Sequence, residues 1–208
     1  MGIELKAPKT VDPAALKVAK QGISNMLQNR PDIAGRMKAR RASLAIIPRA
    51  GFITVLPEFR HFSGKNDPNG NPYDSFNVRG AGGIPAQPVT ATSEENLLRL
   101  KGDPFAAENI TCHEFAHAIM NLGFSVDEQR SWKAIYKAAK QNNLFPGAFA
   151  MTNADEYWAE LSQSYFGVNN EINGPLAIRQ HDSDAFRFLE RIYGSDSSKA
   201  KNGPGEKP

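Results

Sequence analysis

An H-E-x-x-H motif at residues 113–117 constrains this chain more than any other feature. It lies within residues 105–122, a run without proline or glycine that predicts a helix. Residues four apart lie on one face of a helix, so His113 and His117 can direct two imidazole nitrogens at one metal ion. Glu114 stands beside them, where it can take a proton from a water molecule that the metal activates. The motif therefore predicts a zinc site on a helix.

A second motif supplies a candidate for the third zinc ligand. Residues 153–161 predict the start of another helix, with Asn153 as N-cap and Glu156 placed as in a capping box. Catalytic zinc sites commonly have three protein ligands and keep a fourth position for water. We expect Glu156 to complete a His₂Glu set rather than only to favour the helix N-terminus. Glu160, one turn further on the same face, is expected to orient a ligating histidine through its outer N–H.

Other completions of a zinc site fit the sequence less well. The metzincin pattern requires glycine three residues after the second histidine and a third histidine three residues later, where this chain has Met120 and Gly123. His181 lies 64 residues downstream of His117, beside a predicted helix start, and is expected in a substrate cleft or at the surface. The one cysteine, Cys112, can form no internal disulfide and is expected to pack in the core.

The length of 208 residues is enough for one domain with a substantial core. We expect that domain over residues 11–193, after an extended or disordered lead-in at residues 1–10 and before a disordered tail at residues 194–208. No apolar run reaches 18 residues, so no membrane span is expected. Residues 1–6 lack the apolar stretch of a signal peptide. If a leader has been removed ahead of them, a secreted or periplasmic location is favoured.

Charge is uneven along the chain. Residues 1–65 contain 12 Lys and Arg against 4 Asp and Glu, whereas the rest of the chain contains 13 against 18. A basic surface can bind nucleic acid. These cations, however, are spread over two predicted helices without interleaved aromatic residues, so nucleic acid is not the expected partner. The sequence gives no oligomeric state.

The remaining segments predict a mainly helical protein. We expect helices at residues 14–29, 31–41, 127–142 and 182–193. We expect strands at residues 43–48 and 52–56 and an edge strand at residues 88–93, which can bind a peptide by strand addition. The long loops of residues 57–104 are expected to line a site, with residues 93–96 closing the cleft. The predicted class is α+β, with a small mixed sheet beside the H-E-x-x-H helix.

Taken together, the two motifs resemble those of the gluzincin zinc metallopeptidases. Within that group, the chain resembles the anthrax lethal factor-like catalytic domain and its small bacterial relatives, through residues 113–117 and 152–160. The resemblance extends to residues 94–98 and 102–104 in small uncharacterised domains. It implies a zincin-like fold with one zinc ion per chain and with the glutamate that precedes x-x-A-E, Glu156, as the third ligand. It also implies peptide hydrolysis with Glu114 as the general base.

One position departs from the pattern of that family. Lethal factor-like enzymes have a tyrosine four residues before the motif asparagine, and the resemblance implies that its hydroxyl stabilises the tetrahedral intermediate. Phe149 occupies this position and cannot donate a hydrogen bond. Arg79, Tyr157 and His181 are candidates for a replacement donor in the cleft. Loss of one such donor typically costs on the order of 10²–10³ in rate.

Three functions compete on these grounds. The first is zinc-dependent peptide-bond hydrolysis by an endopeptidase that acts on a peptide or protein substrate. The second is a zinc-containing binding protein with little or no turnover, which Phe149 would favour. The third is a basic-surface binding module with structural zinc, whose binding would depend steeply on salt. Turnover that stops in a Glu114→Gln variant would favour the first.

Overall fold

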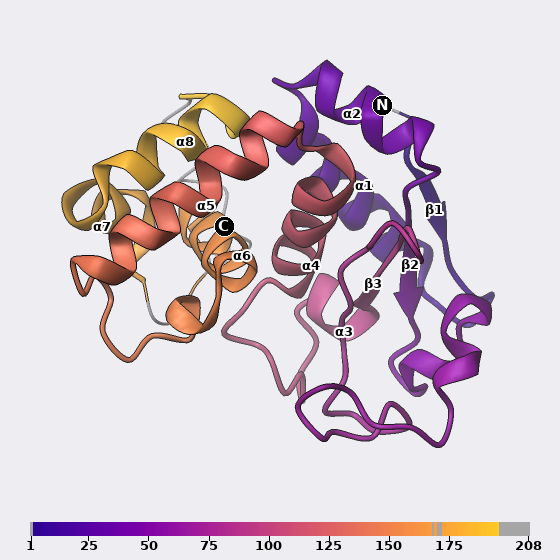
Figure 1. Cartoon of the computed structure of the whole chain (residues 1–208). Helices are drawn as coiled ribbons and strands as arrows, with labels where there is room; N and C mark the ends of the chain where they lie inside the picture. The colour runs from indigo at the N-terminus through magenta and orange to yellow at the C-terminus, as the bar shows by residue number, and fades with distance from the viewer. Residues whose placement is uncertain (1, 168, 170–171, 196–208) are drawn as a thin grey trace, which may run out of the picture.

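The computed structural model describes residues 2–167, 169 and 172–195. Its helices and strands in chain order are β1 (Glu4–Lys6), α1 (Pro13–Leu27), α2 (Pro31–Ala39), β2 (Ser43–Ile47), η1 (Ile53–Val55), η2 (Pro57–Phe62), β3 (Val89–Ser93), α3 (Glu94–Leu97), α4 (Ile110–Ala118), η3 (Ile119–Gly123), α5 (Val126–Gln141), η4 (Phe149–Thr152), α6 (Ala154–Tyr165), α7 (Gly174–His181) and α8 (Ser183–Tyr193). Helix α4 lies at the centre, between the sheet with α1 and α2 on one side and the group α5 to α8 on the other (Figure 1). The expected tail begins at residue 194, and its residues 196–208 lie outside the described part of the chain.

The sheet has three strands in the order β1-β2-β3, and both strand pairs are parallel. Strand β2 is buried along its whole length because both faces of the sheet are covered. Leu44 and Ile46 face the main core, whereas Ala45 and Ile47 face a second apolar cluster. The α+β class with a small sheet beside α4 is confirmed. The sheet was expected to be mixed, but its three strands are all parallel, and the antiparallel pairing at its outer edge is an isolated bridge between Ala81 and Ala91.

The strand expected at residues 52–56 is wrong, because this segment forms the 3₁₀ helix η1. Ile53 and Leu56 are buried in the second apolar cluster, and Val55 between them is exposed. Burial three residues apart fits a helical turn and not the alternation of a half-buried strand. Pro57 then forces Leu56 into an extended conformation, which ends the turn.

Helix α4 is shorter than the predicted run of residues 105–122. It begins at Ile110, because the side chain of Asn109 caps it by accepting a hydrogen bond from the amide of Cys112. Its last turn widens into a π-helix that ends at Gly123. Arg40 of the neighbouring segment donates to the carbonyl of Leu122 at 2.8 Å, and α2 thereby satisfies groups that the widened turn leaves free.

Helices α5 to α8 pack around buried aromatic rings. The rings in mutual contact belong to Phe124, Trp132, Tyr157, Trp158, Phe188 and Tyr193. The indole Nε1 of Trp158 donates to the carbonyl of Ala116 at 2.7 Å, which fixes α6 against α4. Helix α7 was not among the predicted elements. Its apolar content is low, and only Ile178 of its residues is buried.

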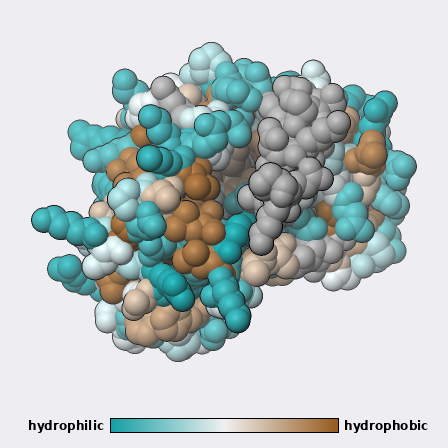
Figure 2. All heavy atoms as spheres, turned by 180° about the vertical axis from the view of Figure 1, so that it is seen from behind, coloured by the Kyte–Doolittle hydropathy of each residue, from teal (hydrophilic) through white to brown (hydrophobic). Residues whose placement is uncertain are grey.

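The surface is mixed in character. Figure 2 shows, from behind, a largely hydrophilic face with an apolar area on its left side. Several cations of the basic N-terminal part are used internally: Arg30 and Arg36 pair with Glu128 at the start of α5. Fewer basic groups are therefore available to an anionic partner than the sequence count indicates. Among the described residues, none of the helices has the length and apolarity to span a membrane.

Candidate metal centre and cleft

Two imidazoles and one carboxylate converge where α4 meets α6. Nε2 of His113 lies 3.1 Å from Nε2 of His117. Oε2 of Glu156 lies 3.2 Å from the first nitrogen and 3.6 Å from the second. These three groups form a cluster that can hold a metal ion.

Local structure explains why these side chains meet. The histidines are one turn apart on α4, so they share the face that turns toward α6. Glu156 lies in the first turn of α6, whose N-cap Asn153 accepts from the amides of Asp155 and Glu156, each at 2.8 Å. The cap fixes the start of α6, and Trp158 fixes the helix against α4. The carboxylate is thereby placed opposite the histidines.

The distances fit a small tetrahedral cation. Metal–ligand bonds of about 2.0–2.1 Å at tetrahedral angles put the ligand atoms about 3.4 Å apart. The three observed separations, 3.1, 3.2 and 3.6 Å, are close to that value. Oε2 of Glu156 is also buried and makes no hydrogen bond with any described residue. Because buried polar atoms are almost always satisfied, this oxygen is suited to a metal ligand.

Glu160 lies on the opposite side of the His113 ring. Its Oε1 is 2.9 Å from Nδ1 of His113. Gln163 holds the same oxygen: its Oε1 accepts from the amide of Asn109 at 2.8 Å, which directs its Nε2 toward Glu160 at 3.2 Å. Asn169 donates to the other oxygen of Glu160. The sequence places Gln163 on the helix face of Glu156 and Glu160 but indicates no role for it, and the structure shows that it contacts Glu160.

The electrostatics of the cluster favour a positive charge between its members. Burial by itself lowers the pKa of His113, but the carboxylates of Glu156 and Glu160 outweigh burial and raise that pKa to about 10. Burial pushes the pKa of Glu156 upward, and the two imidazoles more than reverse this and hold it well below the usual range. A bound cation would supply the same positive charge in place of a proton.

Glu114 faces the cleft beside the cluster. Burial raises the pKa of its carboxyl, and the positive charge of the two histidines opposes that rise. The carboxyl touches the backbone of Gly80: a methyl group added there would lie 2.6 Å from Oε1 of Glu114. A methyl group on Gly82 would lie 2.5 Å from Cβ of His117. Glycine is therefore required at both positions for this close approach.

A cavity of about 540 Å³ opens over these groups. Its lining consists of Asp67, Asn69, Asn71, Asn77, Val78, Arg79, Gly80, Phe105, Glu108, Ile110, His113, Glu114, His117, Phe149, Glu156, Glu160 and Asn169. The loops of residues 57–104 therefore contribute to one wall. Residues 93–96, which the sequence predicts to close the cleft, are not among the lining residues, and Glu94, Glu95 and Asn96 are buried under other segments.

The four candidates for the cleft have different positions. Phe149 lines the cavity with its ring half exposed. Arg79 also lines it, but its guanidinium is directed at Glu95 and at backbone carbonyls. Tyr157 and His181 are not among the lining residues. The Tyr157 hydroxyl is buried and donates to Asp182 at 2.7 Å, and the His181 ring stacks edge-on with Phe145.

The chain was compared with protein families, curated sequences and solved structures, and the matches are to solved structures. No family model matches the chain, and no curated protein sequence does. Among solved structures the chain is similar to the PRO-PRO endopeptidase (PPEP-2) from Paenibacillus alvei. The identity is 13%, the TM-score is 0.50, and the match covers 92% of this chain and 96% of that one. The likeness shows a shared fold, and the zincin-like α+β fold expected from the motifs is confirmed.

Proposed function

We propose that this protein is a zinc-dependent endopeptidase of the gluzincin type, and that it belongs with the lethal factor-like group. The observation that carries the proposal is the convergence of His113, His117 and Glu156 on one point, with Glu114 beside them in an open cavity. The similarity in fold to an endopeptidase supports it. A peptide or protein is the proposed substrate.

The proposed ligands are His113, His117 and Glu156, with one zinc ion per chain. Bound there, zinc would supply Lewis acidity, which polarises the scissile carbonyl and lowers the pKa of water. Glu114 takes the proton of the attacking water and delivers it to the leaving amine. Its raised pKa suits both roles, since the carboxyl must accept and release a proton in one cycle. Glu160 holds the ring of His113 in position.

The sequence predicts that a peptide pairs with the edge strand at residues 88–93, which corresponds to β3. We propose instead that the substrate backbone pairs with residues 79–83. Ala81 and Ala91 exchange both backbone hydrogen bonds, at 2.8 and 3.1 Å, so this segment covers the outer edge of β3. In an antiparallel pair the flanking residues direct their N–H and C=O groups the other way. Gly80 and Gly82 therefore present backbone groups beside Glu114 and His117, where an extended peptide can add as a strand.

A second candidate function is a zinc-containing binding protein with little turnover. It is favoured by Phe149, which lines the cavity where lethal factor-like enzymes have a tyrosine. The described residues that line the cavity include no Ser, Thr or Tyr, so the neutral side-chain donors are asparagine amides. Without a hydroxyl donor, stabilisation of the tetrahedral intermediate would depend on the metal and on these amides.

The test is cleavage of a proteome-derived peptide library by the zinc-loaded protein, followed by mass spectrometry. We expect internal cleavage that disappears in Glu114→Gln, because glutamine is nearly isosteric but cannot act as a base. The variant should keep its zinc content and fold. Glu108→Gln, a change to another carboxylate of the same cavity, is the matched control and should retain most activity. Near wild-type cleavage by zinc-loaded Glu114→Gln would remove Glu114 from the mechanism.

A further inference from the structure

Arg79 is one of the most deeply buried charged side chains of the protein, with 2% of its surface exposed. Its Nε and Nη2 donate to the two oxygens of Glu95 at 2.6 and 2.7 Å. Nη1 donates to the carbonyl of Gly51 at 2.6 Å, and Nη2 also to that of Pro48 at 3.2 Å. This planar fork fixes the side chain in one orientation, which a lysine could not reproduce.

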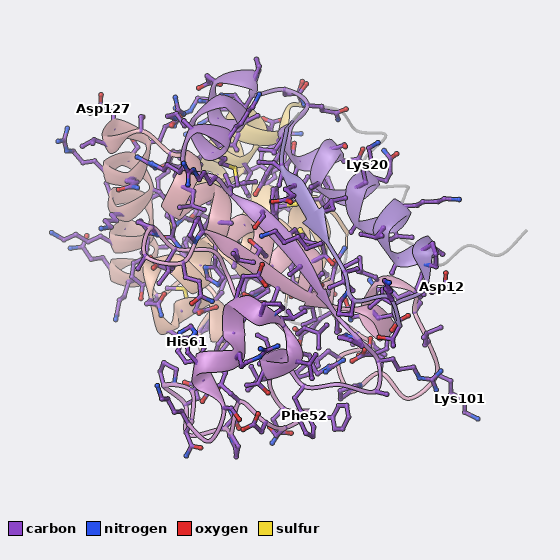
Figure 3. All side chains as sticks on the ribbon, turned by 90° about the vertical axis from the view of Figure 1, so that its right-hand side faces the viewer. Asp12, Lys20, Phe52, His61, Lys101 and Asp127 are labelled. Atoms are coloured by element: carbon purple, nitrogen blue, oxygen red, sulfur yellow. The ribbon has the colours of Figure 1, made fainter. Side chains whose placement is uncertain are left out.

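Aromatic rings cover the outer side of this ion pair. The guanidinium carbon of Arg79 lies 5.3 Å from the ring centroid of Phe76. The ring of Phe76 in turn contacts that of Phe52 edge-on at 5.0 Å. Figure 3 shows Phe52 at the margin of the molecule. The pair is therefore shielded from water on this side, where a charge interaction is stronger.

The other partner, Glu95, belongs to α3, which also holds the start of the H-E-x-x-H helix. The next residue, Asn96, accepts from the amide of Ile110 at 2.9 Å. It also donates to the carbonyls of Phe105 and Glu108, at 2.9 and 3.1 Å. Helix α3 thus connects residue 79 with the first residue of α4 through two consecutive buried side chains.

The residue after Arg79 is Gly80, which touches the carboxyl of Glu114. A shift of the Arg79 backbone would therefore change the space at Glu114 directly. Buried ion pairs contribute little net stability compared with apolar side chains of the same size, and some serve to specify a conformation. The geometry of the Arg79–Glu95 pair fits such a role. Arg79 is followed by Gly80, which contacts Glu114, and Glu95 is followed by Asn96, which binds the first residue of α4.

We propose that Arg79 and Glu95 are positioning residues for the hydrolysis proposed above, on which this inference rests. They hold residues 79–83 at a fixed distance from Glu114 and His117. The substrate backbone and the attacking water then meet Glu114 in a reactive arrangement. A misplacement of about 1 Å at such a point can lower the rate roughly 10²-fold.

The test replaces both charges together, as Arg79→Met with Glu95→Leu, so that no buried charge is left unpaired. We expect unchanged zinc content and a thermal midpoint within a few degrees of wild type. The value of kcat per zinc-loaded chain should fall about 10–100-fold. Lys6→Met with Glu58→Leu removes an ion pair of 2.9 Å that does not line the cavity, and should leave kcat unchanged.

A second readout does not depend on turnover. The amide of Ala81 donates to the carbonyl of Ala91, so its hydrogen exchange reports whether residues 79–83 stay on β3. We expect faster exchange at Ala81 in the double variant and not in the control. Wild-type kcat with unchanged exchange in a folded double variant would overturn the inference.

The remaining outcomes separate this inference from the proposed function. If the wild-type protein cleaves no peptide, the proposed function fails, and exchange at Ala81 still decides whether the ion pair holds the segment. If the double variant does not fold, Arg79→Lys replaces it, because it keeps the charge and loses the fork. An Arg79→Lys variant with wild-type kcat and wild-type exchange would then overturn the inference.

Discussion

Oε1 of Glu160 lies 2.9 Å from Nδ1 of His113, on the side of the ring that faces away from Glu156. The two carboxylates of α6 therefore hold one imidazole from both sides: Glu156 approaches Nε2 and Glu160 approaches Nδ1. We therefore propose different tasks for them. Glu156 is the proposed ligand, and Glu160 is proposed to orient the ring and to raise its basicity.

A Glu160→Gln variant should bind zinc roughly 10–100-fold more weakly than wild type, without loss of a ligand. The affinity is measured by competition with a chromophoric chelator. Asp155→Asn, which removes an exposed carboxylate of the same helix, should leave the affinity unchanged. A structure with Glu160 bonded to zinc and Glu156 turned away would show that the two roles are reversed.

The contact between Gly80 and Glu114 predicts a sharp effect of one methyl group. Gly80→Ala would place a carbon 2.6 Å from Oε1 of Glu114 and 2.7 Å from Cγ2 of Ile110. Because one of these groups must move, we expect a large loss of peptide cleavage at unchanged zinc content. The matched control is Gly35→Ala, where α2 has open space, and this change should stabilise the helix by about 1 kcal/mol. Wild-type kcat in Gly80→Ala would mean that the loop does not approach Glu114 in solution.

Phe149 provides a test in the direction of increased activity. The ring lines the cavity, and we expect a hydroxyl at its para position to reach a bound substrate. Phe149→Tyr should leave zinc binding unchanged and raise kcat on a cleavable peptide, since one oxyanion donor is typically worth on the order of 10²–10³ in rate. An unchanged kcat would mean that another group already donates, and the cavity-lining asparagines should then be substituted one at a time.

The sequence predicts those features of the site that depend on residues close together in the chain. The spacing of His113 and His117 and the cap at Asn153 depend on residues within one helical turn. The structure accordingly brings His113, His117 and Glu156 together, as the motifs predicted. Their roles in binding and catalysis remain predictions that the variants above test.

Contacts between distant segments could not be read from the sequence. The ion pair of Arg79 and Glu95 and the contact of Gly80 with Glu114 join residues 16 and 34 positions apart, with no periodic signal. The sequence makes Arg79 a candidate oxyanion donor, because neither its burial nor its ion pair with Glu95 can be read from the sequence. The apolar run at residues 52–56 predicts a strand because a short apolar run fits a buried strand and a helical turn equally well, and Pro57 is the local signal that favours a break there.

Reconstitution with metal tests the central claim most directly. Protein depleted of metal with a chelator is titrated with zinc while cleavage of a library-derived peptide is followed. The account predicts no cleavage in the depleted protein and full activity at one equivalent of zinc per chain. It also predicts that His113→Ala, His117→Ala and Glu156→Ala each lose most of the bound zinc. Cleavage that survives depletion, or zinc binding that persists in these variants, would contradict it.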